Sequence, residues 1–374
     1  MVRQHIIDCM RYWVSDFHID GFRFDEAPIL SRDKFGRPMQ NPPLLESLAH
    51  DPILAKAKLI AESWDAAGLY QLGNFPAPDK WAEWNGRFRD CIRHFIRGDA
   101  FADPELIHRL QGSPDIYPDR RNHAAVNFIT CHDGFTLNDL VSYNCKHNLQ
   151  NGASNLDGID NNISWNCGEE GETDNPEIKA LRKRQVKNAF ALLMLSRGTP
   201  MMLAGDEFCN SQNGNNNPYC QDSPISWVNW KNMEEHRDVF EFFKKMIWLR
   251  KNHPVLRKRD FFTGHNSSGY PELSFHGEQA WFLNMWSPFL TFGFLYAEPA
   301  ADFKTAEDSF IYCGVNAHWE THKLQLPILP PGMSWKVYAS SADEPINVDE
   351  LSTSYITLSP RSLTVLVGSR EVDF

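Results

Sequence analysis

Hydrophobic positions at the start of the chain recur at helical spacing. They are Val2, Ile6, Met10 and Trp13. Residues three or four positions apart share one face of an α-helix, so this pattern predicts an amphipathic helix from the first residues onward. Because no capping residue precedes it, we expect the chain to begin inside a fold. Two further helices are predicted over 178–196 and 237–252.

Apolar runs with strand character separate these helical segments. The clearest are HIDGFRFD (18–25), KLIAESWD (58–65), AAVNFITCHDG (124–134) and GTPMMLAGDE (198–207). An alternation of strands and helices is typical of a parallel sheet or barrel. Between Gly152 and Pro176 the sequence is rich in Asn, Asp and Gly and has no periodicity, which predicts a long surface loop. This loop does not match the EF-hand pattern, so we expect no metal site.

The pattern changes at about residue 258 to short alternating runs separated by turn residues. The runs are AWFLNMW, SFIYCGVNA, KLQLPIL, WKVYAS, YITL and SLTVLVG. Such runs predict the antiparallel strands of a β-sandwich. A hydrophobic core stops growing at roughly 250 to 300 residues, so a chain of this length favours two domains. We therefore predict an α/β domain over 1–257 and a β-sandwich domain over 258–374.

The composition of the chain limits the classes of binding partner and the cellular compartment that we expect. The chain has 37 Lys and Arg against 48 Asp and Glu, a net charge of -11, which repels phosphate backbones and anionic headgroups. We therefore expect neither a nucleic-acid nor a membrane partner. The sequence has no apolar run of about 18 residues and no signal peptide. Its eight cysteines form no C-x-x-C pair, so we expect reduced thiols and a cytoplasmic location.

The run GFRFD carries the first candidate for catalysis. The strand period of two places Arg23 and Asp25 on one face and Phe22 and Phe24 on the other. In a barrel the polar pair would point inward, where the arginine would favour the ionised form of Asp25, as a carboxylate nucleophile requires. A structural ion pair on a strand is the alternative interpretation.

Two more strand ends carry polar side chains. Glu62 lies beside Trp64 in LIAESWD, and loss of hydration there would raise its pKa, which suits a general acid. His132 and Asp133 follow a strand in TCHDG, where barrel enzymes carry their active residues. Alone, each could be a strand end running into a loop or turn. Their occurrence on three successive strand ends favours catalysis.

These motifs resemble a known superfamily. GFRFD, AESWD and FITCHDG are similar to the second, third and fourth signature regions of the α-amylase superfamily, and GTPMMLAGDEF resembles the region at its eighth barrel strand. WAEWNGRFRD, DGIDNNISWNCGEEG and QDSPISWVNW are similar to its isoamylase and glycogen-debranching branch. The resemblance covers essentially the whole chain. It implies a partial (β/α)8 barrel, strands 4 to 8 only, followed by an antiparallel β-sandwich.

The resemblance also implies roles for individual residues. Asp25 would be the nucleophile, Glu62 the general acid and base, and Asp133 the transition-state stabiliser. Arg23 would hold Asp25 ionised, and His132 and Trp64 would contact the sugar. The implied reaction is retaining cleavage of α-1,6 branch linkages in glycogen-like glucans, with the two carboxyl groups roughly 5 to 5.5 Å apart. It requires neither a metal nor an organic cofactor.

The sequence departs from this family in its first part. The first signature region, three barrel strands and a small β-domain are missing, which fits a truncated gene, a fragment that works beside another chain, or a remnant without catalysis. The alternative function is a catalytically silent glucan-binding module with Trp64, Trp84 and Trp165 as stacking platforms. Glycosyl transfer or α-1,4 cleavage is a third possibility. The sequence leaves the role of Ser63 open.

Overall fold

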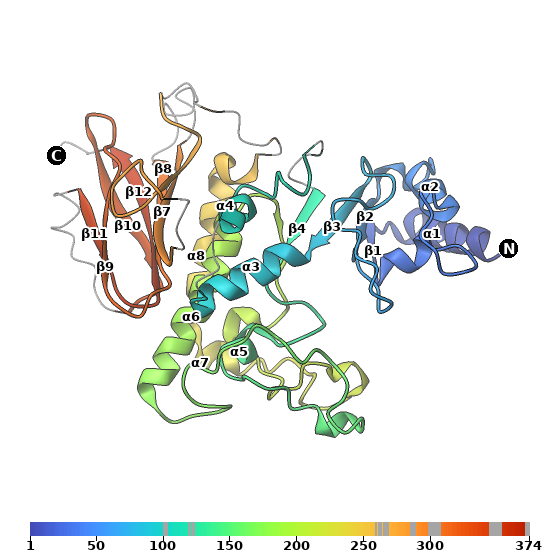
Figure 1. Cartoon of the computed structure of the whole chain (residues 1–374). Helices are drawn as coiled ribbons and strands as arrows, with labels where there is room; N and C mark the ends of the chain where they lie inside the picture. Colours follow the sequence, from blue (N-terminus) through green and yellow to red (C-terminus); the bar gives the residue numbers. More distant parts are fainter. Residues whose placement is uncertain are drawn as a thin grey trace.

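Five short parallel strands form one sheet in the first part of the protein (Figure 1). They are β1 (Gly21–Phe24), β2 (Lys58–Ala61), β3 (Trp81–Asn85), β4 (Ala125–Asn127) and β5 (Thr199–Pro200). Neighbours in the sheet follow each other in the chain and pair in parallel, as in an incomplete barrel. The computed structural model describes residues 1–99, 104–118, 120, 124–258, 260, 264, 269–284, 289–297, 308–343 and 354–370.

Helices connect and cover these strands. They are α1 (Val2–Phe17), α2 (Pro43–Ala49), α3 (Gly86–Arg97), α4 (Pro104–Leu110), α5 (Leu137–Leu140), α6 (Pro176–Leu195), α7 (Asn232–Glu235) and α8 (Arg237–Asn252). The three predicted helices are therefore confirmed as α1, α6 and α8. Asn175 caps α6 by accepting a hydrogen bond from the backbone of Glu177, and the irregular stretch before it confirms the predicted loop.

The side chains of β1 alternate as predicted. Phe22 and Phe24 pack into a hydrophobic cluster with Ile7 and Met10 of α1. Phe24 also meets the buried ring of Trp81 edge-on, with the centroids 4.9 Å apart. This leaves Arg23 and Asp25 for the opposite face of the strand. The strand β3 was not predicted, because the run WAEWN combines polar and aromatic residues.

The second part of the chain confirms the predicted β-sandwich. Its strands are β6 (Leu273–His276), β7 (Thr291–Ala297), β8 (Asp308–Asn316), β9 (His322–Gln325), β10 (Met333–Ser340), β11 (Tyr355–Leu358) and β12 (Ser362–Arg370). One antiparallel sheet has the order β10-β12-β8-β7-β6, and β11 and β9 form a second sheet. A cluster that includes Leu295, Tyr312, Leu324 and Ile356 fills the space between them.

One predicted strand is wrong. The run AWFLNMW is irregular over residues 280–284, and its last two residues lie outside the described part of the chain. Trp281 has a φ of 67°, a left-handed conformation that strands do not contain. The sheet ends instead at β6, which pairs with β7, and neither of these strands was predicted.

Helix α6 joins the two parts. In Figure 1, α3, α4, α6 and α8 lie between the N-terminal strands and the C-terminal sheets. Phe190 of α6 stacks on Phe243 of α8 at 3.6 Å between ring centroids. The same hydrophobic cluster continues to Phe292, Ile311 and Val365 of the sandwich. The domain boundary at residue 257 therefore stays a prediction. No helix in the described ranges is long and apolar enough to cross a membrane.

Candidate active site

The first two predicted carboxylates lie side by side because β1 and β2 are parallel neighbours. Phe24 pairs with Ala61 in the register, and the Glu62 N–H donates to the Phe24 carbonyl at 3.0 Å. Asp25 and Glu62 therefore leave the sheet at the same end. Their environments differ, since the Asp25 side chain is 66% exposed and that of Glu62 only 2%.

Arg23 connects the members of the site. Its Nη1 donates to Asp25 Oδ1 at 2.7 Å, and its Nη2 lies 3.4 Å from Glu62 Oε2. Nη2 is also 3.3 Å from Nδ1 of His132. The guanidinium stacks over the ring of Trp84 at 4.1 Å, which fixes its plane. One arginine thus holds side chains from three strand ends.

The two carboxyl groups differ in acidity. Burial raises the pKa of Glu62 to about 7, and its hydrogen bond with Asp25 acts in the same direction. Partial burial acts to raise the pKa of Asp25 as well, but the hydrogen bond with Glu62 and the charge of Arg23 outweigh it and lower that pKa. Near neutral pH, Asp25 is therefore a carboxylate while Glu62 holds a proton in much of the population.

A strained backbone residue orients Glu62. Glu26 has φ 41° and ψ 45°, a left-handed conformation that is unfavourable for a residue with a side chain. In this conformation its N–H donates to Glu62 Oε2 at 2.8 Å. The bond leaves less freedom for the Glu62 carboxyl group beside Asp25. Strain of this kind is common at functional sites.

The third strand end brings His132 and Asp133 to the same place. His132 Nε2 lies 3.5 Å from Asp25 Oδ1 and 3.6 Å from Asp133 Oδ1. The His132 ring also meets Trp84 edge-on at 5.7 Å between centroids. The structure therefore gathers Arg23, Asp25, Glu62, His132 and Asp133, as the sequence predicted. The roles of the individual side chains stay predictions.

Asp206 is a supporting residue that the sequence analysis missed. It is fully buried, accepts a hydrogen bond from the Thr130 hydroxyl and accepts another from the Leu137 N–H at 2.9 Å. These two residues lie on either side of His132 and Asp133, so Asp206 fixes both ends of that segment. Burial raises its pKa to about 7. The motif LAGDEF contained it, but no pattern indicated its contacts.

The three tryptophans proposed as stacking platforms of a binding module differ in burial and in their contacts. Trp84 is only 7% exposed, so its prediction as a sugar-stacking platform is wrong. Trp165 packs against the core and under the guanidinium of Arg361 at 4.9 Å. Trp64 is half-buried and stacks with Tyr70 at 6.2 Å. Trp64 follows Glu62 by two residues in the chain, and its ring also stacks with Phe128 at 6.4 Å between centroids.

Ser63 points away from the site. Its hydroxyl donates to Oε2 of Glu83 at 3.0 Å, and both side chains are buried. Glu83 in turn forms an ion pair with Arg120 and accepts from the Gly73 N–H at 2.8 Å. The structure therefore gives Ser63 a part in a buried network behind β2 and β3.

A wide cavity lies away from these residues. Its volume is about 1520 Å³, and side chains of the 169–183 segment and of residues 227–238 line much of it. None of the three candidate catalytic carboxylates contacts it. The candidate site is an open surface, since His132 and Asp133 are both about half exposed.

Sequence comparison places the chain beside debranching proteins. It is 43% identical over 352 residues to the chloroplastic isoamylase 3 of Oryza sativa subsp. japonica, covering 93% of this chain and 43% of the rice protein. It is 42% identical over 384 residues to the glycogen operon protein GlgX homolog of Mycobacterium tuberculosis H37Rv, covering 97% of this chain and 52% of that protein. This chain belongs to the isoamylase and glycogen-debranching family.

Solved structures agree with this fold. The type I pullulanase of Bacillus subtilis 168, complexed with maltose, superposes with a TM-score of 0.69 at 19% identity, covering 98% of this chain and 46% of that structure. The pullulanase of Paenibacillus barengoltzii with maltohexaose and α-cyclodextrin gives 0.68 at 20%, covering 98% and 51%. No family model matches the chain. This debranching-family chain spans about half the length of the curated relatives it matches.

Proposed function

We propose that this debranching-family chain carries the catalytic centre of a retaining glycoside hydrolase for α-1,6 branch linkages in glycogen or a related branched α-glucan. One observation carries the proposal. Exposed Asp25 and buried Glu62 leave neighbouring parallel strands at the same end and both contact Arg23, at 2.7 and 3.4 Å. The pKa of Asp25 is lowered, and that of Glu62 is raised to about 7. Retaining glycosidases need such a pair, in which one group is ionised and the other holds a proton.

In the first step Asp25 acts as the nucleophile. Its carboxylate oxygen forms a bond to the anomeric carbon, and the bond from that carbon to the branch oxygen breaks. Glu62 delivers its proton to the departing oxygen, which leaves as a hydroxyl group of the main chain. The product of this step is a glycosyl ester on Asp25. The charge of Arg23, 2.7 Å away, keeps the attacking oxygen ionised beforehand.

In the second step Glu62 acts as a base. Its carboxylate takes a proton from water, the water oxygen bonds to the anomeric carbon, and the ester bond to Asp25 breaks. Both carboxyl groups return to their starting protonation states. Two inversions at one carbon give net retention of the anomeric configuration.

The remaining residues position the sugar. In this proposal Asp133 stabilises the positive charge that develops on the ring, and His132 contacts hydroxyl groups of the sugar at the cleavage point. Trp64 contributes an aromatic face beside Glu62. Arg23 lies within hydrogen-bonding distance of Asp25 and His132, so it positions both.

The substrate class rests on the relatives. Two of them are named for isoamylase and for the glycogen operon, and the Paenibacillus pullulanase was solved with maltohexaose. These names support a branched α-glucan as the substrate of this chain. The net charge of -11 supports the proposal that it binds neither nucleic acid nor membranes, and eight free cysteines support a cytoplasmic location.

The test is release of linear chains from glycogen limit dextrin, measured as new reducing ends and by chain-length analysis. The parent chain is compared with Asp25→Ala and with Asp79→Ala, which removes an exposed carboxylate before β3, at the opposite end of the strands. We expect linear oligosaccharides from the parent and the Asp79→Ala variant, and none from Asp25→Ala. Loss in both variants, or no release by the parent, would overturn the proposal.

Two further measurements separate the alternatives. Proton NMR of the first product reports its anomeric configuration, and an α-anomer is expected for retention. Binding of glycogen that is indifferent to Asp25→Ala, without any hydrolysis, would instead support the silent binding module.

A further inference from the structure

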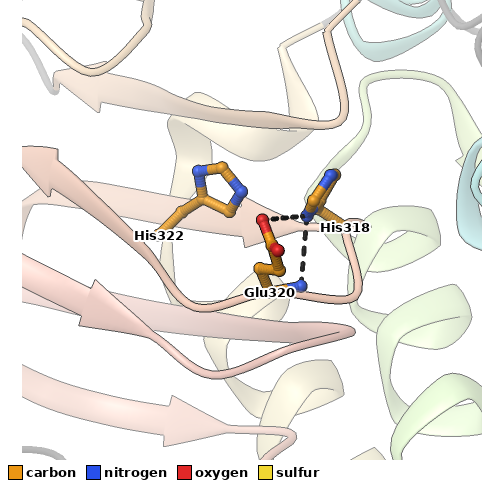
Figure 2. Close-up of side chains that lie close together, drawn as sticks. All are labelled: His318, Glu320 and His322. Atoms are coloured by element: carbon orange, nitrogen blue, oxygen red, sulfur yellow. Dashed lines mark hydrogen bonds and ion pairs between the residues drawn. The ribbon is translucent and has the colours of Figure 1, made fainter.

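The connection between β8 and β9 contains two histidines and one glutamate in the sequence HWETH. One ligand-forming atom from each of His318, Glu320 and His322 lies within 4.8 Å of the others. Figure 2 shows the Glu320 carboxylate between the two imidazole rings. We propose that His318, Glu320 and His322 form a binding site for a divalent cation of the zinc class.

The choice of ligands indicates the class of cation. Two imidazole nitrogens and one carboxylate oxygen suit Zn²⁺, Ni²⁺ or Cu²⁺, whereas Mg²⁺ and Ca²⁺ prefer sites made of oxygen atoms. Three protein ligands around Zn²⁺ leave a fourth position for water. With Zn–N and Zn–O bonds of about 2.0 to 2.2 Å, the ligand atoms of a tetrahedral site lie about 3.3 Å apart. The present separations, which are at most 4.8 Å, therefore need to close by up to about 1.5 Å on binding.

The backbone that carries the ligands is already fixed. The buried side chain of Asn316 accepts a hydrogen bond from the His318 N–H at 2.9 Å and donates to the Glu320 carbonyl at 2.8 Å. The His318 carbonyl accepts from the Arg361 N–H at 2.9 Å. A rigid loop lowers the entropy that a metal site loses on binding. Only side-chain rotations remain for the ligands to make.

The two rings are held differently. His318 stacks on Trp319 at 3.9 Å between centroids, and its Nδ1 accepts from the Glu320 N–H at 3.1 Å. Nε2 of His322 is buried and has no hydrogen-bond partner within the described part of the chain. A buried polar atom without a partner is unfavourable, so His322 loses little by turning toward a cation. Glu320, whose side chain is 71% exposed, supplies the negative charge.

The location gives the site a structural role. Strand β8 belongs to the five-stranded sheet and β9 to the two-stranded sheet, so residues 317–321 cross from one layer of the sandwich to the other. A cation bound there would connect His318 and Glu320 of this crossing to His322, the first residue of β9. Because the folded chain holds the three neighbouring ligands in one fixed turn, binding would favour the folded state and stabilise the sandwich.

The site did not emerge from the sequence, where we expected no metal. The spacing H-x-E-x-H places three ligands two residues apart, which in a straight strand would put them on one face about 6 to 7 Å apart. The turn held by Asn316 brings them closer than that. Neither the candidate catalytic residues nor the glucan chemistry enters this inference.

The test is calorimetric titration of Zn²⁺ into the metal-free full chain. The parent is expected to show one saturable site. The triple variant His318→Ala, Glu320→Gln, His322→Ala should lack this site, and any zinc that it still binds measures the background from exposed cysteines. The single variants Glu320→Gln and His322→Ala should each weaken binding by at least about 10-fold. Glu320→Gln is nearly isosteric at an exposed position, so its folding should be unaffected.

A matched control uses another histidine and glutamate pair. His50 Nδ1 lies 3.8 Å from Glu46 Oε2 on the surface, and no third ligand joins this pair among the residues that the structure describes. His50→Ala should therefore bind Zn²⁺ as the parent does, and Mg²⁺ and Ca²⁺ should give no saturable heat. Zinc should raise the melting temperature of the parent, and the rise should be smaller in Glu320→Gln. An isotherm identical in the parent and the triple variant would overturn the proposal.

Discussion

The strand-end site and the C-terminal sandwich are built in opposite ways. The parallel strands that carry the site have two to five residues each, and Asp25, His132 and Asp133 are about half exposed or more. In the sandwich, β8 and β12 have nine residues each, and eight of the nine in β12 are buried. The sandwich is held by long antiparallel ladders and hydrophobic packing, whereas the site depends on a few polar side chains.

This difference predicts whether a substitution in each region should mainly change activity or stability. At the site, Arg23, the Glu26 N–H and Asp206 position side chains that the short ladders leave free. Removing one of these polar contacts should reduce activity more than stability. In the sandwich, removal of buried apolar volume should reduce stability and leave the chemistry unchanged as long as the chain is folded.

The largest effect is expected from Glu62→Gln. Loss of the general acid should lower kcat for limit dextrin by about 10³-fold, because general acid–base catalysis contributes about 10²- to 10⁴-fold. Glu46→Gln on α2 serves as the control and should keep the parent rate. A residual rate above about a tenth of the parent value would be incompatible with the role proposed for Glu62.

The pH profile of the parent tests the same residue. Because the pKa of Glu62 is raised to about 7, the acid form is present below that pH and is lost above it. Activity should therefore decline on the alkaline side of about pH 7, by about tenfold per pH unit in the limit. In Glu62→Gln this alkaline decline should disappear, and its persistence would assign it to another group.

The next effect is expected in the sandwich. Leu366 is fully buried on β12, and Leu366→Ala should lower the free energy of unfolding by about 2 to 5 kcal/mol. Its cross-strand neighbour Val337 is exposed, and Val337→Ala should cost less than about 1 kcal/mol. Urea denaturation measures both values. Equal costs would show that burial does not control stability in this sheet.

A smaller effect on the rate is expected from Asp206→Asn. The amide can no longer accept from both Thr130 and Leu137, so the segment with Asp133 should shift and kcat should fall by about 10-fold or more. As a control, Asp160→Asn changes an exposed carboxylate in the loop between Gly152 and Pro176 and should leave kcat unchanged. A fall in melting temperature without any change in kcat would make Asp206 a purely structural residue.

The smallest effect is expected from Ser63→Ala. This change removes the hydrogen bond to the buried Glu83, and the free energy of unfolding should drop by about 1 kcal/mol. Its activity and its preferred branch length should equal those of the parent, since the hydroxyl points away from Asp25 and Glu62. A changed product distribution would mean that Ser63 influences substrate choice.

Much of the site was predictable from the sequence because it depends on local rules. The strand period placed Arg23 and Asp25 on one face, and the position of Glu62 at the next strand end made it their neighbour. The burial of Trp84 was not predictable, since a strand residue beside polar neighbours can face either side. The contacts of Asp206 join residues about 70 positions apart, and no local pattern records such a distance.

The sequence by itself determined the alternation of strands and helices, the presence of an antiparallel β-sandwich in the C-terminal part, and the order of the polar strand ends. These features follow from periodicity, which each segment carries alone. The tertiary structure decided which carboxyl group is buried and therefore protonated, which tryptophan is accessible, and that three residues of the β8–β9 connection meet. Burial and proximity depend on what the rest of the chain places around a residue, so only the folded molecule fixes them.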